Sequence, residues 1–185
     1  MESSQPQCVF TTMTRLLLIA LIALTGCTGK PDNIKPVENF QSEKYLGKWY
    51  EIARIDHRFE KGLSKVTAEY SLGKDGGIKV VNRGYSANDN KWSESIGKAY
   101  FVGDEKQAFL KVSFFGPFYG SYIVFELEQE NYQYALISGP DKSYFWLLSR
   151  TPTIDAALQK RLIDKAVKLG FERKQIILVI DGPAA

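Results

Sequence analysis

The chain has little of what several protein classes require. It has two cysteines and one histidine in 185 residues, too few for a disulfide framework or a multi-histidine metal site. Lysine and arginine exceed aspartate and glutamate by only +3, with no basic run that would mark a nucleic-acid interface. The longest apolar run, 16–24, is far shorter than the roughly 20 residues of a membrane-spanning helix. These shortages exclude a disulfide-rich, a nucleic-acid-binding and a multi-span membrane protein.

Aromatic residues, in contrast, are plentiful. They make up 13% of the chain, and such side chains favour β-strands and apolar ligand pockets. The length suits one domain with an adequate core. We therefore expect a single β-rich domain.

The first 26 residues have the pattern of a secretory signal peptide. Arg15 precedes the apolar run 16–24, and small residues follow it. Translation could begin at Met13, and Cys8 is removed in either case. The alternative interpretation is a buried N-terminal helix.

The end of this segment, Leu24-Thr25-Gly26-Cys27, resembles the lipobox of bacterial lipoproteins. The resemblance implies cleavage before Cys27 and a diacylglycerol on its thiol; the alternative is a free cysteine beside an ordinary cleavage site. Because Thr28 and not aspartate follows the cysteine, the resemblance implies sorting to the outer membrane, facing the periplasm. Residues 27–41, rich in polar residues and proline, are expected to form a lipidated tether reaching roughly 40 Å, with a domain over 42–185.

Short β-favouring runs separated by turn residues follow the tether. The first connection, 56–63, is the only long one, and the others suit antiparallel neighbours. An amphipathic helix is expected over Ile154–Leu169, with Thr153 as N-cap and Gly170 after it, then a final strand over Ile176–Ile180. The expected strands are Trp49–Ile55, Ser64–Leu72, Ile78–Tyr85, Lys91–Val102, Phe109–Phe115, Ser121–Glu128, Tyr132–Ser138 and Tyr144–Arg150.

Eight consecutive antiparallel strands with one helix outside predict an all-β, closed up-and-down barrel that holds one small ligand. A Greek-key sandwich is the alternative, but it needs long crossovers that this chain lacks.

Three segments then resemble the lipocalin family. Gly47-Lys48-Trp49-Tyr50-Glu51-Ile52 looks like its first signature, Ser149-Arg150-Thr151-Pro152 like its last, and Tyr132–Ala135 loosely like the middle one. The runs Gly47–Arg54, Val112–Gly120 and Gly139–Ile154 look like the bacterial outer-membrane lipocalins. The resemblance implies that Trp49 and Arg150 stack across the closed end, so that these residues and Gly47 have structural roles.

Strand direction then predicts the open end of the barrel. With Trp49 at the closed end, the connection 56–63 lies at the mouth, as do alternate turns. The predicted mouth residues are His57, Arg58, Phe115, Phe118 and Tyr119. An exposed aromatic loop there could meet a ligand tail, a membrane or a second subunit, or could fold back as a plug.

The two-residue period of strands predicts the residues that line the cavity. The expected ligand-binding residues are Val66, Ala68, Tyr70, Tyr144, Trp146 and Leu148. For the sixth and the seventh strand, the sequence pattern does not decide which face points into the barrel. The predicted cavity is apolar, with few polar atoms.

No catalytic residue is predicted. The sequence has no nucleophile elbow, no phosphate or dinucleotide loop and no interior thiol, and we identify no buried acid or base pair. No cofactor and no metal are expected. Three hypotheses remain: an envelope protein that stores or transports fatty acids or lysophospholipids, a lipid-modifying enzyme, and a structural lipoprotein whose barrel its own side chains fill. Expected partners are the lipid and the outer membrane, with a homodimer left open and no nucleic acid.

Overall fold

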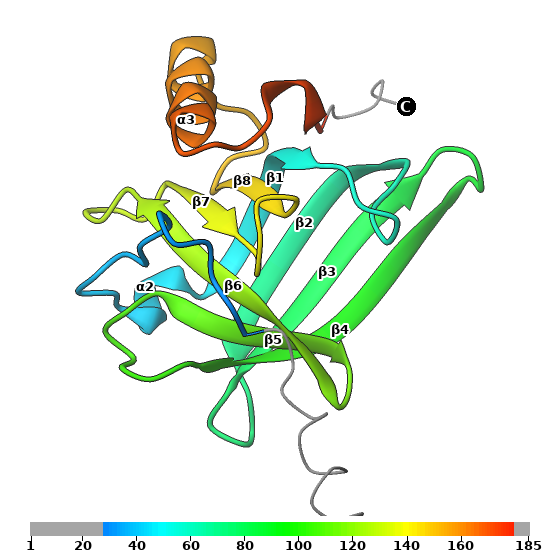
Figure 1. The fold of residues 1–185 in the computed structure, drawn as a ribbon. Helices are drawn as coiled ribbons and strands as arrows, with labels where there is room; N and C mark the ends of the chain where they lie inside the picture. The colour runs from blue at the N-terminus through cyan, green and yellow to red at the C-terminus, as the bar shows by residue number, and fades with distance from the viewer. Residues whose placement is uncertain (1–27, 180–185) are drawn as a thin grey trace, which may run out of the picture.

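The computed structural model describes residues 28–179, which form a β-barrel with one helix packed outside it (Figure 1). Strand order in the sheet is β2-β3-β4-β5-β6-β7-β8-β1-β9, all neighbours being antiparallel, and β1 also pairs with β2 and closes the barrel. The predicted up-and-down topology is confirmed. The strands are β1 (Gly47–Ile55), β2 (Leu63–Leu72), β3 (Ile78–Ser86), β4 (Lys91–Phe101), β5 (Phe109–Phe115), β6 (Phe118–Leu127), β7 (Tyr134–Ser138), β8 (Phe145–Ser149) and β9 (Ile176–Leu178).

Over residues 28–179, three helical elements accompany the strands. The short α2 (Ser42–Tyr45) lies at one end of the barrel, α3 (Ala156–Lys168) packs on its outside, and η1 (Arg173–Gln175) leads into β9 (Figure 1). Within the described residues, no helix is long and apolar enough to cross a membrane.

The helix α3 begins later than the sequence predicted. Its N-cap is Asp155 and not Thr153, because the Asp155 carboxylate accepts hydrogen bonds from the N–H groups of Ala157 and Leu158 at 2.9 and 3.0 Å. The Thr153 carbonyl accepts instead from the Thr151 hydroxyl. A carboxylate at this position also stabilises the helix dipole.

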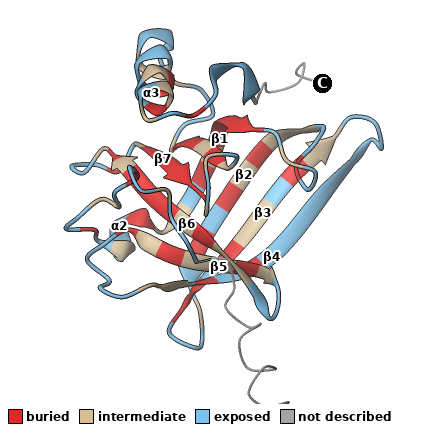
Figure 2. Cartoon of the chain, in the orientation of Figure 1, coloured by how far each residue is buried: buried red, intermediate tan, exposed pale blue. Residues whose placement is uncertain are grey.

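Buried side chains form two clusters, one inside the barrel and one between the barrel and α3. These clusters explain why two strands had no clear inward face. In β7, Ala135 and Ile137 face the interior while Leu136 packs towards α3, so both faces are apolar. In β6, Tyr122 and Val124 belong to the interior. Figure 2 shows buried residues concentrated in β1 and β7, while much of β4 is exposed.

The compact part of the chain begins earlier than the predicted boundary at residue 42. Ile34 is fully buried in the cluster under α3, and Phe40 is buried in the barrel cluster. The backbone N–H of Val37 donates to the carbonyl of Val124, and its carbonyl accepts from the N–H of Ala108, at 2.9 Å each. Two buried apolar side chains and these backbone hydrogen bonds thus dock the segment that was expected to be a tether.

Candidate functional site

The barrel encloses a cavity of about 720 Å³ that opens at one end. All six predicted wall residues, on β2 and at β8, line this cavity: Val66, Ala68, Tyr70, Tyr144, Trp146 and Leu148. They do so because side chains alternate between the two faces of a strand. Apolar atoms make up most of the surface of the cavity wall, so the interior suits an apolar ligand.

The open end is formed by the β1–β2 connection and the β5–β6 hairpin. Arg58, Phe115 and Phe118 line it as the sequence predicted. The ring of His57 lies instead between those of Phe59 and Tyr144, with centroids 5.4 and 4.1 Å away, and burial lowers the pKa of His57. The predicted mouth residue Tyr119 does not line the cavity, and its ring lies 6.2 Å from that of Tyr100.

The opposite end is closed by a stacked pair. The guanidinium carbon of Arg150 lies 4.0 Å from the ring centre of Trp49, whose indole N–H donates to the Tyr45 carbonyl at 2.8 Å. Arg150 also donates to three carbonyls, those of Lys44, Lys48 and Tyr132. Trp49 is fully buried, so this contact supports the barrel rather than a ligand.

Gly47 belongs to the same closed end. It has a φ of +92°, in the left-handed region that favours glycine, and a Cβ there would lie 3.4 Å from Nη1 of Arg150.

Three tyrosine hydroxyls meet inside the barrel. The hydroxyl of Tyr122 lies 2.7 Å from that of Tyr45 and 2.8 Å from that of Tyr70, and all three residues line the cavity. Burial raises the pKa of each, so the hydroxyls stay protonated. They satisfy one another and leave the surrounding wall apolar.

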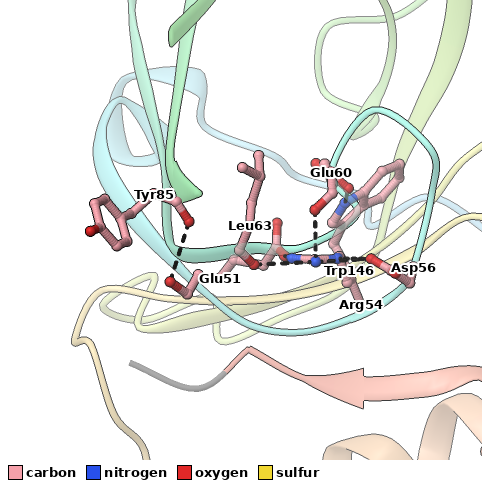
Figure 3. Close-up of polar contacts among 8 residues, drawn as sticks. Glu51, Arg54, Asp56, Glu60, Leu63, Tyr85 and Trp146 are labelled. Carbon is pink, nitrogen blue, oxygen red and sulfur yellow. Dashed lines mark hydrogen bonds and ion pairs between the residues drawn. The ribbon is translucent and has the colours of Figure 1, made fainter. Parts of the chain in front are cut away.

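A buried ion cluster near the mouth was not predicted (Figure 3). Arg54, which is 1% exposed, donates from Nη1 to the Glu51 carboxylate at 2.9 Å and from Nε to Asp56 at 2.9 Å. Its Nη2 donates to the backbone carbonyls of Glu60 and Leu63 at 2.9 and 3.3 Å. One guanidinium therefore ties strand β1 to the beginning of β2.

Two of the carboxyl groups in this cluster also line the cavity. Glu51 and Glu60 are 7% and 8% exposed, and the indole N–H of Trp146 donates to Oε2 of Glu60 at 3.1 Å. Burial, and next the charge of Glu60, raise the pKa of Glu51 to about 8. Burial also raises the pKa of Glu60. Both shifts favour the protonated form of these carboxyl groups inside the cluster.

The expectation that no buried acid pair is present was wrong. Glu51 follows Trp49 by two residues, so the strand period alone places it on the interior face. A register shift between Glu51 and Ala53 then turns Arg54 inward as well, and nothing in the sequence pattern marks that irregularity.

Two further polar atoms in the cavity wall have no partner among the described residues. They are the Ser113 hydroxyl and the Asn82 side-chain carbonyl, and both residues line the cavity. In that same part of the chain, no group of three or more metal-ligating side chains comes together.

Comparison with known proteins agrees with this geometry. A family model described as a lipocalin-like domain matches residues 40–181. The outer membrane lipoprotein Blc of Vibrio cholerae is 54% identical over 163 residues, covering 88% of this chain and 95% of that protein. The protein of the same name in Escherichia coli K12 is 52% identical, covering 86% of this chain and 89% of its own length.

Among solved structures, insecticyanin from the tobacco hornworm Manduca sexta superposes with a TM-score of 0.64 at 23% identity. The match covers 84% of this chain and 88% of that one. At this identity the likeness concerns the fold alone.

Proposed function

The chain belongs to the lipocalin family, and on that premise we propose that it stores or transports fatty acids or lysophospholipids in its barrel at the bacterial outer membrane. The observation that carries the proposal is the cavity of about 720 Å³, apolar along most of its wall and open at one end. Its shape suits a ligand with one long apolar chain and a polar end near the mouth.

The place of the protein in the cell follows from its relatives and its own sequence. The bacterial relatives are named outer membrane lipoproteins, and this chain has a lipobox ending at Cys27. The protein is lipid-anchored at the outer membrane. Cys27 lies outside the described residues, and we propose it as the acylated position. One acyl chain holds a protein weakly, whereas two or more hold it firmly.

The energetics of acyl burial support the proposed ligand class. Each buried methylene contributes roughly 0.8 kcal/mol, so ten of them contribute about 8 kcal/mol before ordering costs. That gross figure corresponds to micromolar binding. The six wall residues named above are the proposed contacts of the acyl chain, with Arg58 and Lys61 near its polar end.

Mass spectrometry of lipid extracted from natively purified protein tests the proposal. We expect fatty acids or lysophospholipids in stoichiometric amount. A folded protein that yields no lipid, and takes up none after delipidation, would support a barrel that serves a structural role only.

The buried pair Glu51 and Glu60 favours a second candidate, a lipid-modifying enzyme, because a carboxyl group with a raised pKa can act as a general acid or base. Both groups are already engaged, Glu51 by Arg54 and Glu60 by Trp146. Because neighbouring side chains already hold both carboxyl groups, a structural role in a binding protein accounts for them better than a catalytic role. Incubation with a lysophospholipid, followed by mass analysis, should return the lipid unchanged; conversion lost in Glu51→Gln would favour the enzyme.

A further inference from the structure

The first residues that the structure describes lie against the mouth half of the barrel. The hydroxyl of Ser121 donates to the backbone carbonyl of Gly29 at 2.6 Å. Ser121 follows Phe118, the first residue of β6, by three positions, or about 10 Å along the strand. In the sequence Cys27 comes two residues before Gly29, a separation that a fully extended chain spans in about 7 Å.

From Gly29 the chain runs along the barrel towards the closed end. Asn33 donates to the carbonyl of Leu169 at 2.8 Å, and Val37 pairs with Val124 as described above. Phe40 then donates to the carbonyl of Lys106 in the β4–β5 turn, at the closed end, at 2.9 Å. In Figure 1 this blue segment crosses β5 and β6 and ends at α2. Because the segment is docked, little free chain separates the mouth half of the barrel from the anchor.

Apolar side chains are exposed at that same end. Phe115 and Phe118, at the tip of the β5–β6 hairpin, are 80% and 75% exposed, and Phe59 on the mouth loop is 59% exposed. All three also line the cavity opening. A cluster of exposed rings at one end usually marks a contact surface. Aromatic and aliphatic side chains of this kind enter the boundary between lipid head groups and acyl chains.

We propose that the mouth of the barrel faces the membrane leaflet that holds the anchor, with Phe115 and Phe118 inserted among its lipids. Gly29, two residues after the proposed anchor, lies in the same half of the barrel as the exposed rings, so in one orientation both can reach the membrane. A lipid can then pass between leaflet and cavity without crossing water. The orientation rests on the anchor of the proposed function, but not on which lipid fills the cavity.

Site-directed spin labelling of the mature, acylated protein in vesicles tests the orientation. Once Cys8 is removed and Cys27 acylated, introduced cysteines are the only free thiols. Gly116→Cys reports on the hairpin tip, where a Cβ would meet no atom within 4 Å, and Lys74→Cys reports on the exposed β2–β3 turn at the closed end. Vesicles of phosphatidylethanolamine and phosphatidylglycerol provide the membrane.

We expect the label at position 116 to be accessible to oxygen in the lipid and protected from an aqueous nickel chelate, and the label at 74 to behave oppositely. Equal exposure of both labels to the chelate, or protection at 74 alone, would overturn the orientation. In Phe115→Ser/Phe118→Ser the protection at 116 should be lost. Leu72→Ser, which removes a 70% exposed side chain at the closed end, is the matched control and should leave it unchanged.

Two further results distinguish membrane insertion from dimerisation, and the orientation from lipid storage. If the wild-type protein is dimeric and the double serine variant monomeric, and the wild-type label at 116 is protected from the chelate but not accessible to oxygen in the lipid, a second copy covers the rings and the proposal is wrong. Lipid extraction from the same samples tests the proposed function separately. An empty barrel with a protected label would refute lipid storage alone, whereas a loaded barrel with an exposed label would refute the orientation alone.

Discussion

The indole N–H of Trp146 donates to the carboxyl group of Glu60 at 3.1 Å, which joins the barrel wall to the loop at its mouth. The backbone carbonyl of the same glutamate accepts from Arg54 at 2.9 Å. The position of the mouth loop therefore depends on the buried ion cluster and on a residue that faces the ligand cavity. Figure 3 shows these groups converging beneath the loop.

Replacing Arg54 should destabilise the fold strongly. Arg54→Met leaves the Glu51 carboxyl and two backbone carbonyls without their donor, and each buried acceptor left unsatisfied costs about 1–3 kcal/mol. Urea unfolding measures the loss. The double variant Glu51→Leu/Arg54→Met should recover part of it, because it removes the buried acid as well. A single variant as stable as wild type would contradict the structural role of Arg54.

Stability should depend on pH through Glu51. Its pKa is raised from the usual 4.5 to about 8, so between these values the native state binds more protons than the unfolded state. The contribution of Glu51 to the free energy of unfolding therefore falls as the pH rises from about 4.5 to about 8.

The control for this dependence is Glu51→Gln, which cannot ionise. The difference in unfolding free energy between wild type and Glu51→Gln, measured by urea unfolding at a series of pH values, should decline across that window. A difference that stays constant with pH would show that Glu51 is not protonated in the folded protein.

The sequence predicted the wall of the cavity better than its polar interior. The period of two placed Ala68 and Trp146 correctly, because β2 pairs regularly with β3 from Thr67 onward and β8 pairs regularly with β7. It could not place Arg54, whose inward position depends on a register shift in β1. It also missed the docking of Ile34, since one apolar residue between prolines gives no periodic signal.

Substitution of Arg150 should lower the stability of the fold and leave the affinity for the ligand unchanged. Arg150→Ala removes the contact with Trp49 and the donors to three carbonyls, which we expect to cost about 2–3 kcal/mol of unfolding free energy. Thermal unfolding measures this cost, and a lipid titration of the folded protein checks affinity. Reduced affinity at unchanged stability would mean that Arg150 contacts the ligand.

Filling the cavity should shorten the acyl chain that fits. Ala68→Phe adds a ring to the wall where space is present, so stability should be retained while affinity falls most for the longest chains. Glu69→Phe, the neighbouring outward position, is the control and should leave affinity unchanged. Lipid titration and thermal unfolding give the two readouts. Equal losses at every chain length would argue against an acyl site beside Ala68.

The most direct test of the lipid-binding function is a fluorescence titration of the delipidated, folded protein with saturated fatty acids of increasing length. Trp146 lines the cavity and should report the binding. We predict that affinity rises by up to about fourfold with each added methylene until the cavity is full, and then levels off. An affinity that does not change with chain length, or no binding at all, would contradict the proposal that this barrel holds an acyl chain.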